Sequence, residues 1–274
     1  MQSIEDVDRV LASEFDLDWE AVVDEITTFI RNTVKAAGAH GSVVGLSGGI
    51  DSSLVAKLLV KALGRERVLS VLMPTSFTPA KDIDDAKWLV NDLQIKSEIV
   101  DIQPTVDMLA KALQTRGDLE GTKMPLANVR SRTRMVILYY YANLNSYLVA
   151  GTGDRSEDLI GYFTKYGDGG VDFLPISHLY KTQVRKLAEH LGLPPSIVMK
   201  PSSPQLYPGH KATDEIPLDY DQLDHVLRML FDESRPAAEV AAKTKVGINT
   251  VQDVITRFED SAHKRAYPLM VRQW

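Results

Sequence analysis

Residues 45–53 read GLSGGIDSS, a polar stretch rich in glycine and serine with one aspartate. It follows the β-branched run SVVGL (42–46) and precedes SSLVAKLLVKALG (52–64), whose leucines Leu54, Leu58 and Leu59 recur at helical spacing. In a parallel α/β sheet, ligands bind in the loops at the carboxyl ends of the strands. The backbone N–H groups of such a loop and the N-terminus of the next helix can enclose an anion, and glycines let the backbone approach it.

This stretch has three other interpretations. A Walker A loop is excluded because the spacing differs and no lysine follows the glycines. A nucleophile elbow is a genuine alternative, since Gly45-Leu46-Ser47-Gly48-Gly49 fits G-x-S-x-G between a strand and a helix. The preceding chain, however, has no strand and loop to supply the second oxyanion donor. A plain turn, in which serine and aspartate cap the helix, would account for an isolated glycine pair.

The segment SGGIDSS (47–53) resembles the pyrophosphate-binding loop of the N-type ATP pyrophosphatases. Members of that superfamily adenylate a carbonyl or carboxyl oxygen and release pyrophosphate. The resemblance implies that Ser47 donates a hydrogen bond to phosphate and is not a nucleophile, and that Asp51 binds Mg²⁺, which favours carboxylate ligands. The ATP contacts implied for this loop are Gly45, Leu46, Ser47, Gly48, Gly49, Ile50, Asp51 and Ser52.

Later stretches resemble the NAD synthetases within that superfamily. They are NVRSRTRM (128–135), GTGDRSE (151–157), GYFTKYGDGGVDFLPI (161–176), LYKTQVRKLAEHLG (179–192), PSSPQLYPGHKATDE (201–215) and HKR (263–265). The resemblance implies that Thr152 and Ser203 contact ATP, with Ser202 as the alternative to Ser203. It also implies that Lys181 binds the phosphates and that Glu157 binds Mg²⁺. From the residues alone, GTGDRSE is a turn with capping-box spacing, and Lys181 is the first basic residue of a helix.

The resemblance also implies a site for deamido-NAD. Its contacts are Arg132, Lys165, Asp172, His263 and Lys264, with Tyr162 or Phe163 stacked on the pyridine ring. Taken without the resemblance, these residues are a solvated basic helix face, a glycine-rich hairpin and a basic helix end. Helical spacing puts Arg130 and Arg134 on one face and Arg132 nearly opposite, so all three cannot serve one pocket.

The reaction implied by the resemblance is ATP-dependent amidation of deamido-NAD to NAD through an adenylated intermediate, with release of AMP and pyrophosphate. Asp51, Glu157 and Lys181 are the expected catalytic residues, with Mg²⁺ as cofactor. The sequence has no cysteine, which argues against a tRNA-thiolating enzyme and against a glutaminase, whose nucleophile is a cysteine. The synthetase-like region begins near residue 41, and we expect the chain to use free ammonia. Ile50, GTGDRSE and His210 depart from common bacterial motifs and indicate another branch of the family.

The composition is that of a globular protein, with 44% hydrophobic and 25% charged residues. A net charge of −6 argues against nucleic acid as a partner. No apolar run is long enough to cross a membrane, and the acidic N-terminus lacks the features of a signal peptide, so we expect a cytoplasmic protein. The resemblance favours a homodimer, with the N-terminal helix and residues 135–147 as candidate surfaces.

Alternating strands and helices predict an α/β fold, a doubly wound parallel sheet with helices on both faces and helical N- and C-terminal additions. We expect residues 1–274 to form a single domain. The predicted strands are 42–46, 67–74, 96–102 and 147–152. The predicted helices lie within 1–40 and at 52–64, 79–93, 105–115, 126–145, 181–192, 219–232 and 236–262. The proline-rich segment 194–217 is predicted to be a long surface loop, a type that often forms a lid.

Overall fold

The computed structural model describes residues 15–113, 122–268 and 270–271. Its sheet is parallel throughout, with the strand order β3-β2-β1-β4. The strands are β1 (Gly41–Gly45), β2 (Val68–Leu72), β3 (Lys96–Ile99) and β4 (Tyr147–Ala150). All four predicted strands are present, each ending one to three residues earlier than the sequence suggested, because the last residues of the apolar runs turn into the loops at the carboxyl edge.

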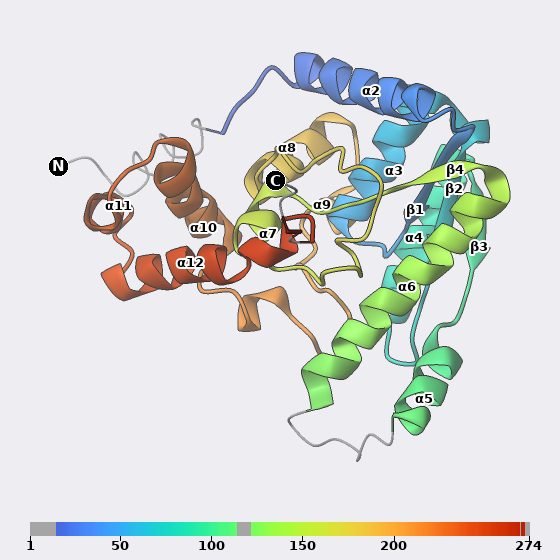
Figure 1. Ribbon diagram of the computed structural model, residues 1–274. Helices are drawn as coiled ribbons and strands as arrows, with labels where there is room; N and C mark the ends of the chain where they lie inside the picture. The colour runs from blue at the N-terminus through green and yellow to red at the C-terminus, as the bar shows by residue number, and fades with distance from the viewer. Residues whose placement is uncertain (1–14, 114–121, 269, 272–274) are drawn as a thin grey trace.

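Helices cover both faces of this sheet, as predicted (Figure 1). Adjacent residues of β1 point to opposite faces. Val44 therefore packs in a core with Leu54 of α3, whereas Val43 packs in a core with Val106 of α5, against which Leu138 of α6 also packs. The helices of these layers are α2 (Trp19–Ala36), α3 (Ile50–Leu63), α4 (Ala80–Leu93), α5 (Gln103–Ala112), α6 (Lys123–Asn145) and α8 (Lys181–His190).

The C-terminal helices form a second hydrophobic core beside the α/β layers (Figure 1). They are α10 (Tyr220–Leu227), continued by a π-helical turn at Arg228–Asp232, then α11 (Ala237–Thr244), α12 (Ile248–Asp260) and a short 3-10 helix at Ala262–Lys264. The prediction of one helix over 236–262 was wrong. Lys245 adopts a left-handed conformation (φ 58°), which ends α11, and Gly247 then caps α12.

Three further segments bear on the predictions. Within the predicted N-terminal helical region, α2 is present, and residues 1–14 lie outside the described residues. Segment 194–217 is mostly irregular, as expected, but contains the short helix α9 (Pro195–Val198) and a 3-10 turn at Ala212–Asp214. Helix α7 (Arg155–Leu159) follows β4. Among the helices of the described residues, none is long and apolar enough to cross a membrane.

Candidate active site

The glycine-rich loop connects the carboxyl end of β1 to the N-terminus of α3, as predicted. Gly48 has a φ of +77°, and a Cβ atom at this position would lie 2.1 Å from the carbonyl oxygen of Asp82. Only glycine can therefore occupy this position without strain or a steric clash. Ser52 and Ser53 both donate hydrogen bonds to the Gly49 carbonyl, at 3.2 and 2.7 Å, which ties the loop to the first turn of α3.

Ser47 is held inside this loop. Its Oγ atom accepts a hydrogen bond from the Gly49 N–H at 3.2 Å and lies 3.1 Å from the Oγ atom of Ser52. Within the described residues, the hydrogen bonds of the Ser47 hydroxyl go to these two groups, and neither is a base. This arrangement disfavours the nucleophile elbow, because a serine nucleophile requires an adjacent proton acceptor.

A cavity of about 650 Å³ opens at the carboxyl edge of the sheet, next to the loop. Residues from α6, from segment 161–171 and from segment 200–215 complete its wall. The predicted site residues that line it are Gly45, Leu46, Ser47, Gly49, Ile50, Asp51, Ser52, Thr152, Glu157, Tyr162, Phe163, Ser202, Ser203 and Lys264. The predicted site residues that do not line it, all within the described ranges, are Gly48, Lys181, Arg132, Lys165, Asp172 and His263.

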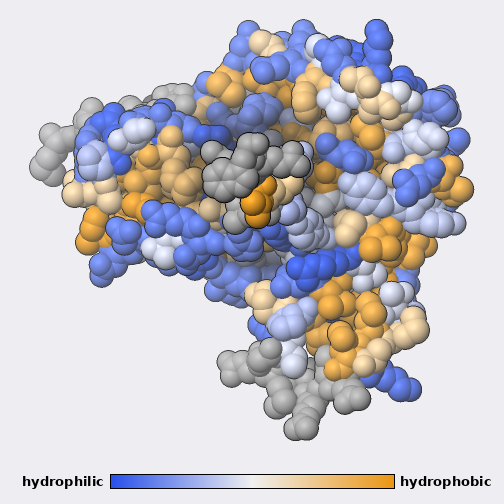
Figure 2. Space-filling view, in the orientation of Figure 1, coloured by the Kyte–Doolittle hydropathy of each residue, from blue (hydrophilic) through white to orange (hydrophobic). Residues whose placement is uncertain are grey.

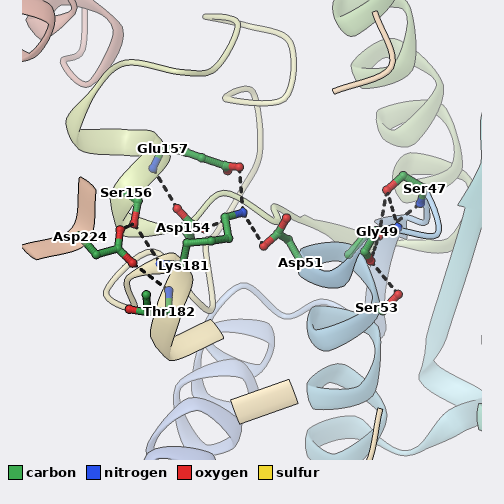
Figure 3. Close-up of polar contacts among 11 residues, drawn as sticks. Ser47, Gly49, Asp51, Ser53, Asp154, Ser156, Glu157, Lys181, Thr182 and Asp224 are labelled. Atoms are coloured by element: carbon green, nitrogen blue, oxygen red, sulfur yellow. Dashed lines mark hydrogen bonds and ion pairs between the residues drawn. The ribbon is translucent and has the colours of Figure 1, made fainter. Parts of the chain in front are cut away.

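Lys181 lies fully buried beside this cavity, at the centre of three carboxylates (Figure 3). Its Nζ atom is 2.8 Å from Asp51 Oδ1, 2.8 Å from Asp154 Oδ2 and 3.0 Å from Glu157 Oε1. The sheet brings these side chains together, because α3 follows β1 and α7 follows the neighbouring strand β4. The three residues predicted to be catalytic therefore meet at one point.

Asp154 was missed as a site residue, because its place before a helix identified it only as a cap. The capping role is present, since its Oδ1 atom accepts a hydrogen bond from the Glu157 N–H at 2.9 Å. Its other oxygen, however, contacts Lys181. The spacing of Asp154 and Glu157, three residues apart at a predicted helix start, could have indicated two carboxylates on one side of the turn.

Burial and mutual charge set the protonation of this group. Burial alone would favour a neutral Lys181, but the three carboxylates outweigh it and hold the pKa of the ammonium well above its usual value. Burial raises the pKa of the Glu157 carboxyl well above its usual range, and raises that of Asp154 as well, although Lys181 opposes both shifts. Three carboxyl groups surround one ammonium, and their mutual repulsion contributes to the raised pKa values of Glu157 and Asp154, so a further cation would favour their ionised forms.

Asp51 and Glu157 fit the requirements of Mg²⁺. Their side chains are 22% and 21% exposed and line the cavity, whereas Asp154 is fully buried. Mg²⁺ is commonly bound through one or two carboxylates, with phosphate and water oxygens completing its shell. Asp51 and Glu157 can supply the carboxylates, and the adjacent glycine-rich loop is placed to hold the phosphates.

Four of the five residues predicted to contact deamido-NAD gather where segment 161–165 meets the C-terminal 3-10 helix. Arg132 donates to the Lys165 carbonyl at 3.2 Å, and Lys165 Nζ donates to the His263 carbonyl at 2.5 Å. Lys264 Nζ donates to the carbonyls of Gly161 and Phe163, at 2.7 and 2.9 Å. These bonds anchor the C-terminal 3-10 helix to the wall of the cavity.

Asp172 lies apart from that group. Its carboxylate accepts hydrogen bonds from the Val149 N–H at 2.7 Å and from the Tyr139 hydroxyl at 3.0 Å. These contacts tie segment 161–176 to the edge strand β4 and to α6. Together with burial, the Asp172 carboxylate raises the pKa of Tyr139 to about 12.

Segment 200–217 is fastened over the cavity by two sets of contacts. Lys200 Nζ donates to the Gly48 carbonyl at 2.7 Å and contacts Asp82 at 2.8 Å. Arg130 and Arg134, which share one face of α6 as predicted, donate to the backbone carbonyls of residues 206 and 205. The segment thus contacts both the glycine-rich loop and α6.

A buried polar group that the sequence did not reveal joins segment 200–217 to segment 161–171. His210 Nε2 lies 3.2 Å from the Tyr162 hydroxyl and 3.0 Å from Glu215 Oε2, and the ring of Tyr207 stacks on the imidazole at 3.8 Å. Burial lowers the pKa of His210, and the opposing contact with Glu215 does not restore it. A neutral imidazole therefore lies in the wall near the predicted aromatic contacts.

Comparison with known proteins places these features in a family. Residues 22–268 match the family described as NAD synthase. The chain is 49% identical over 262 residues to an NH3-dependent NAD+ synthetase from Hyperthermus butylicus, an alignment that covers 95% of this chain and 94% of the relative.

Two solved structures are similar to the whole fold. One is an NH3-dependent NAD synthetase from Campylobacter jejuni, in complex with the nitrate ion, with a TM-score of 0.79 and 31% identity over 94% of this chain and 100% of that one. The other is an NMN synthetase from Francisella tularensis, with a TM-score of 0.82 and 29% identity over 94% of this chain and 100% of that one.

Proposed function

The chain belongs to the NAD synthase family, and on that premise we propose that it amidates deamido-NAD to NAD with ATP and ammonia. The observation that carries the proposal is the meeting of Asp51, Glu157 and Lys181 beside the cavity. These side chains come from the glycine-rich loop, the helix after β4 and the start of α8.

The reaction proceeds in two steps. An oxygen of the nicotinate carboxylate attacks the α-phosphorus of ATP, the bond to the bridging oxygen breaks, and pyrophosphate leaves. Ammonia then attacks the carbonyl carbon of the adenylate, AMP leaves with the oxygen that joined it to the carbonyl, and one proton is released. A carboxylate has a poor leaving group, so passing through the adenylate replaces one difficult step by two easier ones.

The protein's main contribution is to position and neutralise the phosphates. The N–H groups of the glycine-rich loop and the N-terminus of α3 hold the pyrophosphate portion of ATP, and the buried Lys181 ammonium adds a positive charge beside the cavity. Asp51 and Glu157 would hold Mg²⁺, which would offset the charge that develops on the leaving pyrophosphate. Thr152, in the loop after β4, and Ser203, in segment 200–217, contact the same nucleotide.

Deamido-NAD occupies the part of the cavity lined by segment 161–171, away from the phosphates of ATP. Tyr162 or Phe163 stacks on its pyridine ring, since both side chains line the cavity. Of the polar contacts expected for it, Lys264 lines the cavity, and Arg132, Lys165 and His263 lie behind that wall, joined to one another by hydrogen bonds. Asp172 lies apart from them and does not line the cavity.

We also propose that the α/β layers and C-terminal helices act as one domain and that two chains form a homodimer. Leu159 packs in the second core while Glu157, on the same turn, contacts Lys181, so the two parts share the site. Val136, Tyr140 and Leu144 form an exposed apolar stripe on α6, each more than 60% exposed. Apolar side chains gather over α6 in Figure 2. A stripe of this kind suits burial against a second copy.

The test is an assay with the purified chain, ATP, MgCl₂, ammonium chloride and deamido-NAD. We expect NAD and AMP to form in equal amounts, with no product when ATP is omitted. A parallel reaction with nicotinic acid mononucleotide addresses the likeness to an NMN synthetase. Faster amidation of the mononucleotide would overturn the choice of deamido-NAD, and ester hydrolysis without ATP would instead support the serine-hydrolase alternative.

A further inference from the structure

Asp224 is a fully buried carboxylate on α10, outside the cavity and outside every motif of the sequence analysis. It belongs to the C-terminal helical part of the chain. Unlike the carboxylates around Lys181, its hydrogen bonds within the described residues go to one hydroxyl and one backbone N–H. Burial is the main cause that raises its pKa, to about 7. Burying a carboxylate away from water is energetically unfavourable, so the position of Asp224 requires an explanation.

Its contacts join the starts of two helices that carry the site. Oδ1 accepts a hydrogen bond from the Ser156 hydroxyl at 2.5 Å, and Oδ2 accepts one from the Thr182 N–H at 2.8 Å. The Ser156 oxygen in turn accepts a hydrogen bond from the Lys181 N–H at 2.9 Å. Figure 3 shows this chain of bonds beside Lys181, on the side away from Asp51.

These contacts fix the backbone on both sides of the charged group. Ser156 precedes Glu157 in α7, and Lys181 and Thr182 are the first two residues of α8. The first N–H groups of a helix have no partner within the helix, so the Ser156 hydroxyl and the Asp224 carboxylate satisfy two of those of α8. A negative charge at this end is also favourable to the helix dipole. Asp224 therefore connects the first turn of α8, which carries Lys181, to Ser156, the neighbour of Glu157.

We infer that Asp224 is a positioning residue, which acts through Ser156 to keep Lys181 and Glu157 in place for binding and cleaving ATP. The inference rests on the function proposed above. It assigns to the C-terminal helices a direct influence on the ATP site. Displacement of a reacting group by about 1 Å can cost about 100-fold in rate, so loosening this link should lower turnover even though Asp224 touches no substrate.

The informative variant is Asp224→Asn. The asparagine has nearly the same shape, but only one of its two ends can accept a hydrogen bond, so either the Ser156 hydroxyl or the Thr182 N–H loses its acceptor. Val226→Ala is the matched control, because Val226 is a fully buried residue of the same helix and takes no part in the chain of bonds. Ser156→Ala removes the middle of the chain and serves if Asp224→Asn does not fold.

Three quantities are measured for each variant: the melting temperature, the affinity for ATP with Mg²⁺ by calorimetric titration, and kcat for NAD formation. We expect Asp224→Asn and Ser156→Ala to lower kcat about 10- to 100-fold and to weaken ATP binding. Val226→Ala should lower the melting temperature but keep kcat within about 2-fold. The double variant Asp224→Asn/Ser156→Ala should be no worse than the poorer single variant, because both changes break the same link.

The inference is overturned if Asp224→Asn keeps the kcat and ATP affinity of the unchanged chain, or if Val226→Ala loses as much of either at a comparable loss of melting temperature. The inference would also be contradicted if the fold-loss of kcat in the double variant equalled the product of the losses in the two single variants. Failure of the proposed function has a different signature, since the unchanged chain would then form no NAD. The ATP titration would still compare the variants in that case.

Discussion

The Lys181 ammonium lies 2.8 Å from Asp51 Oδ1, an ion pair between residues 130 positions apart in the chain. Lys181 is fully buried, whereas Asp51 keeps about a fifth of its side chain exposed toward the cavity. The pair therefore links the glycine-rich loop to the start of α8 and leaves part of the Asp51 carboxylate exposed to the cavity. It is where a nucleotide and its metal would enter, and removing its charge is the first test of the site.

Asp51→Asn and Glu157→Gln should each lower kcat for NAD formation by at least ~100-fold, the scale of losing one group that stabilises developing charge. Both changes keep the size of the side chain and remove a carboxylate from Lys181 and from Mg²⁺. Circular dichroism should show an unchanged fold. Asp84→Asn, at an exposed position of α4, is the control and should keep full activity. Near-normal rates in both site variants would place the metal elsewhere.

Ser47→Ala should reduce activity about 10- to 100-fold, because it removes one hydrogen bond to phosphate and one bond within the loop. A serine nucleophile would behave differently, since its removal from a hydrolase costs about 10⁶-fold in kcat. Steady-state assays at saturating ATP distinguish these outcomes. A fluorophosphonate probe provides the control, because the unchanged chain should not be labelled at Ser47. Labelling there together with complete loss of activity would restore the hydrolase interpretation.

The buried carboxylate of Asp224 predicts a pH-dependent stability. Its pKa is about 7 in the folded chain, against 3.8 as the ordinary value, with Asp154 as a nearby negative charge. The folded state thus holds a proton that the unfolded state has released, and the stability this gives is lost as the pH rises from about 4 through 7. Asp224→Asn does not titrate, so its unfolding free energy should improve relative to the unchanged chain by up to about 4 kcal/mol over that range.

Urea denaturation of both proteins at pH 5, 6, 7 and 8 measures this difference. Comparing the two proteins cancels the titration of groups that they share. A difference that stays constant across these pH values would mean that Asp224 is ionised throughout.

Free ammonia should be the nitrogen source for this chain. The sequence has no cysteine to act in a glutaminase, and only unprotonated ammonia has the lone pair that attacks the adenylate. At fixed, subsaturating total ammonium, the rate of NAD formation should rise toward alkaline pH until a group on the enzyme titrates. Ammonia-free glutamine should give no NAD, and robust NAD formation from it by the chain alone would refute this prediction.

Local patterns in the sequence predicted most of the fold. The alternation of β-branched runs with helical spacing placed the four strands of the described sheet, and the motifs placed Asp51, Glu157 and Lys181 in one site. The break between α11 and α12 escaped prediction because a left-handed Lys245 has no sequence signal as clear as glycine at that position. Asp154 and Asp224 escaped for a different reason, since their roles depend on partners 27 and 42 residues away or more.

The central claim is that ATP activates the substrate carboxylate by adenylation, and the most direct measurement of it is transfer of oxygen. Deamido-NAD is prepared with oxygen-18 in both carboxylate positions and is converted with ATP, Mg²⁺ and ammonia, and the products are analysed by mass spectrometry. The account predicts one oxygen-18 atom in AMP, one retained in the amide of NAD, and none in pyrophosphate. Unlabelled AMP, or label found in pyrophosphate or phosphate, would contradict it.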